Sequence, residues 1–315
     1  MERGINTRCL HLEETEGKTD NYGALTFPIY QTATYAHPAV GQSTGYDYSR
    51  LQNPTREHLE KVVASLEGGI DALALSTGIA AITLMMELFK PGDHLIVESD
   101  LYGGSIRLFN NVSEKNGIEF SRVACSNEDV ESHVKDNTKA IYIETPTNPM
   151  MNVTDIGALA GIAKRHGLLL IVDNTFLSPY FQNPLKLGAD IVIHSGTKYL
   201  GGHNDTLAGF IVTNNEEISE KLRFLIKTTG AGLSPFDSFL LERGIKTLGI
   251  RMERAQENAF ALAEWLKKQD VVTKVIYPGL PEHPGHEIMK KQARGFGAMI
   301  TFDLDTKEHA IALLE

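Results

Sequence analysis

The stretch LLLIVDNTFLSPYFQNPLKLGADIVIHSGTK, residues 168–198, contains two short apolar runs, each followed by a cluster of polar residues. The runs cover 168–173 and 189–194, and their Ile, Val and Leu content is typical of strands buried on both faces. The polar groups are Asp173-Asn174-Thr175 after the first run and Ser195 to Lys198 after the second. The stretch therefore predicts two strands of a sheet whose ends carry chemically useful side chains.

Similar patterns extend this sheet along the chain. Near-continuous apolar runs separated by amphipathic helical patterns indicate an α/β fold with a mostly parallel sheet sandwiched by helices. The other predicted strands are 71–75, 94–98, 140–144 and 207–213, and the last of these could run antiparallel after its tight connection. The predicted helices include 79–89, 128–136 and 155–166, and one that begins at Asn53-Pro54-Thr55 and ends at Gly68-Gly69.

The chain divides by pattern into three segments. Residues 1–52 are rich in Gly, Thr, Tyr and Pro and weakly periodic, so we expect an extended N-terminal arm. Residues 53–235 form the large α/β domain, and residues 236–315 begin a smaller α+β domain. The elements expected in the smaller domain are a helical stretch at 235–269 and strands at 272–277 and 297–304. Because Ala310–Glu315 has a mid-helix pattern, we expect this domain to be truncated.

Composition excludes several classes of protein. The chain has 30 Lys and Arg against 40 Asp and Glu, a net charge of −10, which argues against nucleic acid or an anionic membrane as partner. Its two cysteines, Cys9 and Cys125, form neither a disulfide framework nor a CxxC motif. The N-terminus has no apolar signal segment, and no run approaches the ~18 apolar residues that span a bilayer. We therefore expect a cytoplasmic protein.

Polar residues at the ends of the predicted strands are the candidates for function, because open α/β sheets bind ligands at the carboxyl ends of their strands. The strand ends carry Ser76-Thr77-Gly78-Ile79, Glu144 to Pro149, Asp173 and Ser195 to Lys198. The Ser-Thr-Gly turn fits an anion site at a helix start or an ordinary N-cap equally well. The chain contains neither a P-loop nor the glycine motif of a dinucleotide fold.

Asp173 and Lys198 allow two interpretations each. Asp173 is either a turn or cap residue, or an ionised acid that pairs with a protonated ring nitrogen or a metal. A metal is disfavoured because no His, Cys or carboxylate cluster has ligand spacing. Lys198 is either a solvated loop charge or an amine that forms a Schiff base with an aldehyde cofactor. Pyridoxal phosphate needs such a lysine, an acid for its ring nitrogen and a phosphate cradle, so we predict this cofactor and no metal.

Four motifs carry a family resemblance: Tyr48-Ser49-Arg50-x-x-Asn53-Pro54-Thr55, Tyr102-Gly103-Gly104, Glu144-Thr145-Pro146-x-Asn148-Pro149 and the run from Asp173 to His203. Together they resemble the signature of the Cys/Met-metabolism family of pyridoxal-phosphate enzymes. This family includes cystathionine γ-synthase, the cystathionine β- and γ-lyases and O-acetylhomoserine sulfhydrylase. The resemblance extends from about residue 5 to the end of the chain, and it implies the fold-type I architecture of these enzymes.

The resemblance implies a role for each motif residue. Lys198 is expected to anchor the cofactor and move protons, Asp173 to keep the ring nitrogen protonated, and Tyr102 to stack on the ring and assist acid–base steps. We expect burial and nearby positive charge to lower the pKa of Lys198, so that it acts as a base. The other expected cofactor-binding groups are the N–H groups of Gly78 and Ile79, the hydroxyls of Ser195 and Thr197, and the amide of Asn148.

The resemblance also implies an assembly. In this family the residues that match Tyr48 and Arg50 reach the cofactor phosphate of a neighbouring subunit, so we expect a homo-oligomer, a dimer of dimers, with active sites shared across the dimer interface. Asn204 stands where relatives usually have serine, a change expected to have little effect. Relatives continue several tens of residues beyond position 315 and carry there the arginine for the substrate carboxylate. We therefore expect an incomplete substrate site.

The resemblance further implies a carbon–sulfur lyase of transsulfuration and methionine biosynthesis. We favour β-elimination of cystathionine to homocysteine, pyruvate and ammonia. The alternatives are γ-elimination of cystathionine and γ-replacement on an activated homoserine ester, the reaction of cystathionine γ-synthase and O-acetylhomoserine sulfhydrylase. An alternative of another class is a truncated chain that binds the cofactor without turnover. The sequence alone does not separate these reactions.

Overall fold

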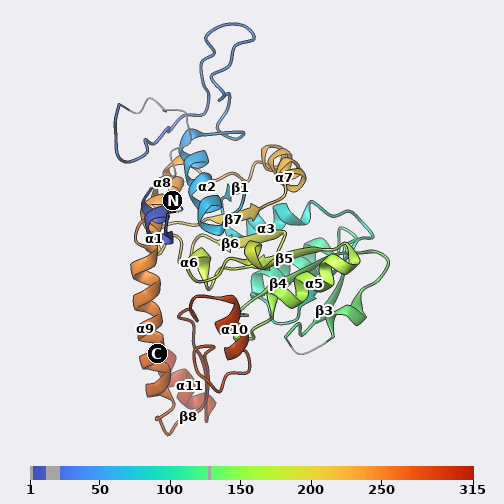
Figure 1. Ribbon diagram of the computed structural model, residues 1–315, viewed down its shortest axis with the longest axis vertical. Coiled ribbons are helices and arrows are strands. Elements are labelled where there is room, and N and C mark those ends of the chain that lie inside the picture. Colours follow the sequence, from blue (N-terminus) through green and yellow to red (C-terminus); the bar gives the residue numbers. More distant parts are fainter. Residues whose placement is uncertain (1–2, 12–21, 127–128) are drawn as a thin grey trace.

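The centre of the computed structural model, which describes residues 3–11, 22–126 and 129–315, is a seven-stranded sheet with helices on both faces (Figure 1). Its strands are β1 (Asp71–Leu75), β2 (His94–Glu98), β3 (Glu119–Val123), β4 (Thr138–Glu144), β5 (Leu169–Asp173), β6 (Ile191–Ser195) and β7 (Gly209–Thr213). The strand order is β1-β7-β6-β5-β4-β2-β3. Strand β7 runs antiparallel to β1 and β6, and the other pairs are parallel. The predicted α/β class is confirmed.

Helices cover the two faces of this sheet. The helices are α1 (Ile5–Leu10), α2 (Pro54–Glu67), α3 (Gly78–Met86), α4 (Gly103–Leu108), α5 (Ile156–His166), α6 (Ser178–Phe181), α7 (Glu216–Thr229), α8 (Pro235–Ile245), α9 (Leu248–Leu266), α10 (His286–Gln292) and α11 (Lys307–Leu314). Short 3-10 or π turns are η1 (Phe109–Ser113), η2 (Val130–His133) and η3 (Pro184–Leu187). None of the helices in the described ranges is both long and apolar enough to cross a membrane.

The strands alternate between two hydrophobic cores, as the period of two along a strand requires. On β5, Leu170 and Val172 point into the core beneath α2 and α5, whereas Ile171 points into the core beneath α3 and α7. Both cores are closed to solvent, since all three side chains are 0% exposed. This burial on both faces explains why the strands have near-continuous apolar sequences.

A third, smaller core forms where α9 meets a two-stranded antiparallel sheet, β8 (Val272–Ile276) and β9 (Thr301–Leu304). Its buried members include Ala259, Ala263 and Tyr277. By contrast, α8 and the start of α9 add Leu241 and Met252 to the main core beneath α2. The first part of the segment 236–315 therefore packs against the large domain, because α8 lies against α2.

The structure differs from the predicted elements in three places. Strand β3 was not predicted, because EFSRV lies at the sheet edge and is largely exposed, so it lacks the apolar run of the central strands. The predicted helix at 128–136 is a single 3-10 turn, η2, and residues 127–128 lie outside the described ranges. The helical stretch 235–269 is two helices, which meet at Lys246-Thr247.

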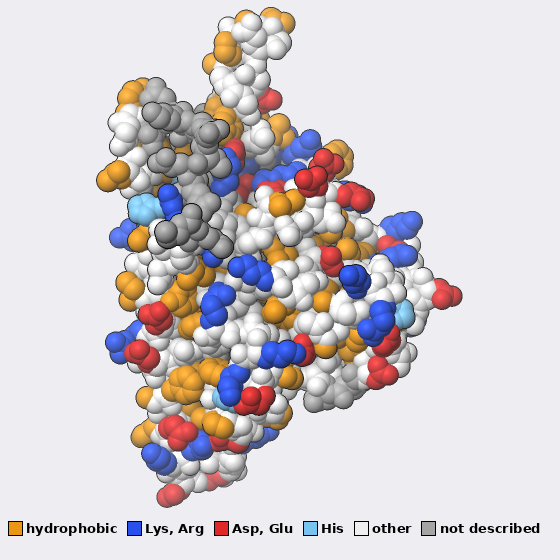
Figure 2. All heavy atoms as spheres, in the orientation of Figure 1, with side chains coloured by type: hydrophobic (Ala, Val, Ile, Leu, Met, Phe, Trp, Pro, Cys, Tyr) orange, Lys and Arg blue, Asp and Glu red, His pale blue; other side chains and the backbone are white. Residues whose placement is uncertain are grey.

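The N-terminal segment is only partly an extended arm. Residues 22–52 contain no helix, only isolated bridges such as Thr34 with Tyr48, and they project well beyond the body of the molecule (Figure 1). In contrast, α1 packs against α2 and α9 and buries Cys9. The beginning of the predicted 1–52 arm therefore belongs to the body, and residues 12–21 lie outside the described ranges. On the face shown in Figure 2, acidic and basic side chains are interspersed over most of the body.

Candidate functional site

The carboxyl ends of three predicted strands lie side by side, and this end of the sheet is called the sheet edge below. Strands β4, β5 and β6 are consecutive neighbours, and Glu144 at the end of β4 pairs in register with Asp173 at the end of β5. Asp173 in turn pairs with Ile193, two residues before Ser195 on β6. The tertiary structure therefore places the acid of the predicted site between a second carboxyl and the turn that leads to Lys198.

The fourth strand end, that of β1, is brought close to the end of β6 because the residue between them on β7 is a glycine. On β7, Gly209 pairs with Leu75 at the end of β1 and with Ser195 at the end of β6. A Cβ at position 209 would lie 2.1 Å from the Thr77 carbonyl oxygen, and a Cβ at Gly78 would lie 2.9 Å from the Ser195 Cβ. Both positions accept only glycine without rearrangement, so the turn after β1 packs directly on Ser195.

The start of α3 offers hydrogen-bond donors at this contact. Thr77 is the N-cap, and its hydroxyl accepts a hydrogen bond from the Ala80 N–H at 2.9 Å. Within the described ranges, the N–H groups of Gly78 and Ile79 donate to no protein acceptor. Free N–H groups and the positive end of the helix dipole suit an anion such as a phosphate. The sequence left the N-cap and the anion site as alternatives. In the structure both are possible, because the Thr77 hydroxyl makes the cap and the N–H groups of Gly78 and Ile79 can bind the anion.

The Asp173 carboxyl is buried, with 8% of its surface exposed. Its Oδ1 accepts hydrogen bonds from the Thr175 N–H at 3.0 Å and from the Thr175 hydroxyl at 2.6 Å. Burial raises the pKa of Asp173, and the two Thr175 hydrogen bonds oppose this effect by stabilising the carboxylate. The same Thr175 oxygen accepts from the Ser195 N–H at 2.8 Å, so Thr175 joins the ends of β5 and β6.

Two buried hydroxyls lie beneath this edge. Tyr142 on β4 and Ser105 on α4 are buried. Within the described ranges neither hydroxyl makes a hydrogen bond of ordinary geometry, although the Tyr142 hydroxyl lies close to Ser105 and to the Asp173 carboxyl. Burial raises the pKa of Tyr142 well above its usual value, and the negative charges of Asp173 and Glu144 raise it further. The phenol therefore stays protonated and adds a neutral polar group to the floor of the site.

Two carboxylates hold the loops that carry Tyr102 and Asn148. Glu144, at the end of β4, accepts a hydrogen bond from the Tyr102 N–H at 2.9 Å. Asp100, after β2, accepts from the Met150 N–H at 3.1 Å and from the Thr147 hydroxyl. Each strand end therefore holds the loop that follows the other strand. The Tyr102 ring is 46% exposed and Asn148 is half-buried, so both remain accessible to a ligand.

Glu144 gives the first testable prediction, a change in how stability depends on pH. Burial, and then the nearby charge of Asp173, raise its pKa well above the ordinary value of 4.5. Because the folded pKa is raised, this carboxyl contributes stability below pH 4.5, and the contribution is lost as pH rises toward the folded pKa. One proton changes the free energy of unfolding by about 1.4 kcal/mol per pH unit within this window.

Glu144→Gln keeps an acceptor for the Tyr102 N–H but cannot ionise. We expect the variant to gain stability relative to the wild type as the pH rises from about 5 to 8. Urea unfolding of both cofactor-free proteins across this range measures the difference. Glu217→Gln, at an exposed residue of α7, is the matched control and should leave the pH slope unchanged. Parallel curves for Glu144→Gln and wild type would contradict the prediction.

Lys198 lies in the turn after β6, where its N–H donates to the Ser195 carbonyl at 3.2 Å. Its side chain is exposed and makes no ion pair or hydrogen bond with the described part of the chain. The amine was expected to be buried, and in the single chain this is wrong. The turn that carries it lies at the carboxyl end of a central strand, and its side chain is exposed there. The Thr197 hydroxyl, predicted to bind phosphate, donates to the Ala208 carbonyl at 3.3 Å.

A hollow of about 810 Å³ opens beside this turn. Its lining includes the hydroxyl residues Ser76, Thr77 and Thr197 and the acidic residues Asp205 and Asp237. The remaining lining residues are Asn204, Thr206, Leu207, Gly232, Leu233 and Ser234. The hollow is wide and polar enough to admit a ligand or a protein segment to the turn that precedes α3.

Tyr48 and Arg50 are not brought into this cluster. They lie at the base of the arm, where the Arg50 guanidinium stacks over the Tyr48 ring at 5.3 Å and donates to the Lys227 carbonyl. Arg56 holds this base, because its guanidinium donates to the Ser49 and Leu51 carbonyls at 2.9 and 3.2 Å. Neither Tyr48 nor Arg50 contacts the Gly78 turn within the described ranges.

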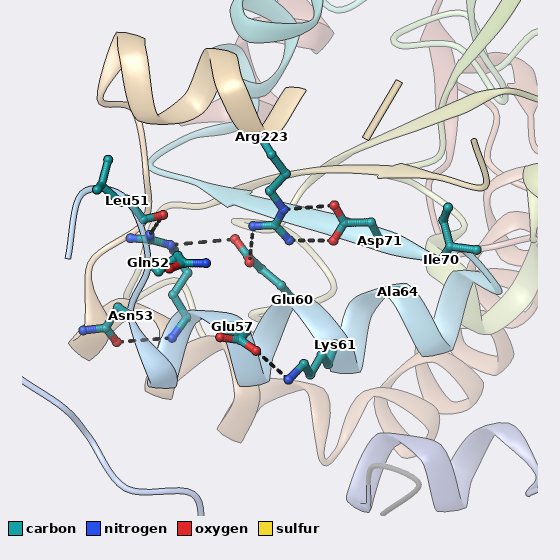
Figure 3. Close-up of a pocket in the computed structure, with 11 residues that line it drawn as sticks. Leu51, Gln52, Asn53, Glu57, Glu60, Lys61, Ala64, Ile70, Asp71 and Arg223 are labelled. Atoms are coloured by element: carbon teal, nitrogen blue, oxygen red, sulfur yellow. Dashed lines mark hydrogen bonds and ion pairs between the residues drawn. The ribbon is translucent and has the colours of Figure 1, made fainter. Parts of the chain in front are cut away.

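A second hollow, of about 290 Å³, lies between α2, α7 and the start of β1, beside the last residues of the arm (Figure 3). Its charged side chains bind one another. Arg223 donates to Glu60 at 2.7 Å and to Asp71 at 2.9 Å, and Lys61 pairs with Glu57 at 2.6 Å (Figure 3). With these charges neutralised internally, the hollow has the character of a structural ion network rather than a reaction site.

The residues whose role the sequence did not reveal are those that hold the candidate site residues in place. Thr175, Glu144 and Asp100 hold the strand ends and loops; the sequence pointed to Thr175 and Glu144 only as members of strand-end motifs, and it did not point to Asp100. The position of Thr175, directly after the Asp-Asn pair, was an available signal for a capping hydroxyl. No group of three or more His, Cys, Asp or Glu side chains among the described residues is arranged to hold a metal ion.

Comparison with known proteins agrees with this geometry. Residues 6–315 match the family described as Cys/Met metabolism PLP-dependent enzyme. The chain is 53% identical over 293 residues to a cystathionine gamma-lyase of Bacillus subtilis, covering 93% of this chain and 77% of that protein. It is 50% identical over 308 residues to a cystathionine beta-lyase of Lactococcus lactis subsp. cremoris, covering 98% and 80%.

A solved structure shows the same fold. A cystathionine gamma synthase from Xanthomonas oryzae pv. oryzae, in complex with aminoacrylate and cysteine, superposes with a TM-score of 0.95. The two proteins are 39% identical, and the superposition covers 99% of this chain and 81% of that one. The similar proteins thus carry three different names for reactions at sulfur-containing amino acids.

Proposed function

The chain belongs to the Cys/Met metabolism pyridoxal-phosphate-dependent enzymes, and from this premise we propose that it is a carbon–sulfur lyase that acts on cystathionine. The observation that carries the proposal is the convergence of the Gly78 turn, Asp173 and the Lys198 turn at one sheet edge. We favour β-elimination, which converts cystathionine and water to homocysteine, pyruvate and ammonia. γ-Elimination to cysteine, 2-oxobutyrate and ammonia is the second candidate, supported by the 53% identical relative.

The residues at this edge fit pyridoxal phosphate. The N–H groups of Gly78 and Ile79, which lack protein acceptors in the described ranges, would donate to the phosphate together with the Ser195 hydroxyl. The Asp173 Oδ1 atom is held by Thr175, and the Oδ2 atom takes part in neither of these two hydrogen bonds. It is therefore the atom that would accept the ring N–H. The absence of a Cβ at Gly78 lets the turn approach Ser195 closely.

When bound, the pyridinium ring withdraws electrons from the substrate carbon that bears the amino group. Asp173 would support this by holding the proton at the ring nitrogen, because a carboxylate in a buried position strongly favours a positive partner. Lys198 would bond the cofactor aldehyde and, as a free amine, accept and return the Cα proton. Tyr102 would lie against the ring, and Asn148 would donate its amide N–H to the ring oxygen.

The position of the arm supports a shared site. Tyr48 and Arg50 would reach the phosphate of a neighbouring subunit, since the arm extends from its own body and the Arg50 fork suits phosphate oxygens (Figure 1). Residues 22–52 bury little of their own surface, with Leu25 and Val40 fully exposed, which favours packing against a second copy. We propose a homotetramer, built as a dimer of dimers, that works in the reducing cytoplasm, where both cysteines would stay as thiols.

Product analysis tests the function. The purified chain is loaded with pyridoxal phosphate and incubated with cystathionine, and 2-oxo acids are separated and quantified. Pyruvate with homocysteine supports the β-lyase, and 2-oxobutyrate with cysteine supports the γ-lyase. A parallel incubation with O-acetylhomoserine and cysteine should give no cystathionine. If the protein acquires the visible absorbance of bound cofactor but forms no product from any of these substrates, it binds the cofactor without turnover and the lyase proposal fails.

A further inference from the structure

A fully buried carboxylate lies behind the cofactor edge and takes no part in the proposed reaction. Glu67 is the last residue of α2 and is 0% exposed. Its Oε1 atom accepts hydrogen bonds from His194 Nε2 at 2.7 Å and from Asn174 Nδ2 at 2.8 Å. Because a buried carboxylate is costly without donors, these contacts define a specific polar cluster within an otherwise apolar core.

The two donors belong to the strands that carry the predicted cofactor residues. Asn174 follows Asp173 at the end of β5, and His194 precedes Ser195 on β6. Successive side chains of a strand point to opposite faces, so His194 lies with Val192 on the α2 side while Ser195 lies with Ile193 on the α3 side. Glu67 therefore joins β5 and β6 from behind, at the level where their ends carry the cofactor residues.

Two buried amides extend the cluster. Gln182 Nε2 donates to the Asn174 Oδ1 at 3.0 Å and to the Thr145 carbonyl at 3.3 Å, which adds the end of β4. Asn183 Nδ2 donates to Glu67 Oε2 at 3.3 Å. Gln182 and Asn183 are 0% and 4% exposed. The His194 Nδ1 atom has no hydrogen-bond partner among the described residues, but each amide of the cluster can move only by breaking several hydrogen bonds, which fixes the members relative to one another.

The C-terminal segment docks on the same cluster. Arg294, after α10, donates to the Asn183 Oδ1 at 2.9 Å and to the Pro179 carbonyl at 2.7 Å. Gln292 Nε2 donates to Gln182 Oε1 at 3.3 Å. The positive charge of Arg294 interacts with Glu67 and helps to balance the buried carboxylate. The cluster thus connects α2, the three central strand ends and the residues after α10.

We propose that Glu67 is a positioning residue for the cofactor: through His194 and Asn174 it fixes the separation of Asp173 and Ser195. The inference rests on the proposed function, because it takes these residues to hold the ring nitrogen and the phosphate. The distance between the ring nitrogen and the phosphate of the cofactor is nearly fixed. If the ends of β5 and β6 shift relative to each other, the cofactor cannot contact Asp173 and Ser195 at the same time. Thr175 supplies the matching link on the front of the sheet.

The affinity of the cofactor-free protein for pyridoxal phosphate tests this role, by absorbance titration and without any turnover. Glu67→Gln keeps the size of the side chain, removes its charge and places an NH2 group against the donors of His194 or Asn183. We expect the dissociation constant to rise at least about tenfold, the size of effect seen when outer partners of metal ligands are lost.

Two further variants separate positioning from general stability. Asp190 accepts the Leu170 N–H at 2.8 Å and so joins the same two strands at their amino ends. Asp190→Ala removes this link and should lower the unfolding temperature while leaving the cofactor affinity unchanged. His194→Gln retains a donor for Glu67 and should fold even if Glu67→Gln does not; its dissociation constant should lie between those of wild type and Glu67→Gln. The double variant should bind no more weakly than Glu67→Gln alone, since the two residues act as one unit.

The possible outcomes are distinct. If wild-type protein fails to bind pyridoxal phosphate, the proposed function is wrong and the positioning role falls with it. If wild type binds and both Glu67→Gln and His194→Gln bind equally tightly while unfolding at lower temperature, the cluster is structural only and the proposal is overturned. If Asp190→Ala weakens binding as much as Glu67→Gln, any link between the strands has the same effect and the specific role of Glu67 is rejected.

Discussion

Replacing Lys198 with alanine is expected to lower kcat/KM for cystathionine by at least about 10³-fold, because the variant loses both the covalent anchor and the base. Pyridoxal phosphate should still associate through the Gly78 turn and Asp173, but borohydride treatment should no longer fix it to the protein. Peptide mapping of reduced wild-type protein measures this directly, since the mass of the cofactor should appear only on the peptide that contains Lys198. Stability should change little, because the side chain is exposed.

Lys164→Ala is a matched control, since Lys164 is an exposed lysine in the last turn of α5. It should retain full activity and full labelling by borohydride. Label on another lysine, or an active Lys198→Ala protein, would show that the turn after β6 carries only a solvated charge. The interpretation of the whole sheet edge as a pyridoxal-phosphate site would then have to be abandoned, because no other predicted residue supplies the amine.

Asp173→Asn is expected to reduce kcat/KM by about 10³-fold, because the amide presents an N–H where the cofactor ring needs an acceptor. The Thr175 donors can still bind the amide oxygen, so the local fold should persist. Burial raises the pKa of Asp173, which means that its ionised form is a cost to the folded cofactor-free protein. The cofactor-free variant should therefore be at least as stable as wild type at neutral pH while its activity is lost.

Paired measurements check this combination. Urea unfolding of the cofactor-free proteins gives the stability, and steady-state kinetics at saturating pyridoxal phosphate give the activity. Asp190→Ala, just before β6, should behave in the opposite way, with reduced stability and retained activity, because it removes the acceptor of the Leu170 N–H. An Asp173→Asn enzyme with normal kcat would show that Asp173 is merely the cap of the turn at Thr175.

The carboxylates Asp173 and Glu67 illustrate how the carboxyl ends of the strands are held in place. Asp173 lies between Glu144 and the β6 turn on the cofactor side, whereas Glu67 lies behind β6 on the other side. Each of these buried carboxylates needs its own hydrogen-bond donors to offset the cost of its burial. Thr175 supplies them for Asp173, and His194 and Asn174 supply them for Glu67. The site is consequently supported by polar contacts on both faces, which limits how far the strand ends can move.

Much of the fold followed from local patterns. The central strands have near-continuous apolar sequences because each is buried on both faces, and the start of α2 at Asn53 and its end at Gly68 follow from capping chemistry. The patterns failed where burial is partial: β3 is an exposed edge strand, and the first residues of the expected arm are a helix packed on α2 and α9. An edge strand and a six-residue helix bury too little for a clear apolar period.

The sequence by itself determined which chemical groups this protein possesses at its strand ends: a lysine in a small-residue turn, an acid after an apolar strand and a glycine turn at a helix start. Only the tertiary structure decided which of them meet. Gly209 brings the Gly78 turn against Ser195, Thr175 links Asp173 to β6, and Glu67 reaches His194 across 127 positions of the chain. Such contacts depend on strand order and on close approach of backbones, which no local pattern encodes. For the same reason the sequence suggested a buried Lys198, while the fold leaves this amine exposed at the carboxyl end of a central strand.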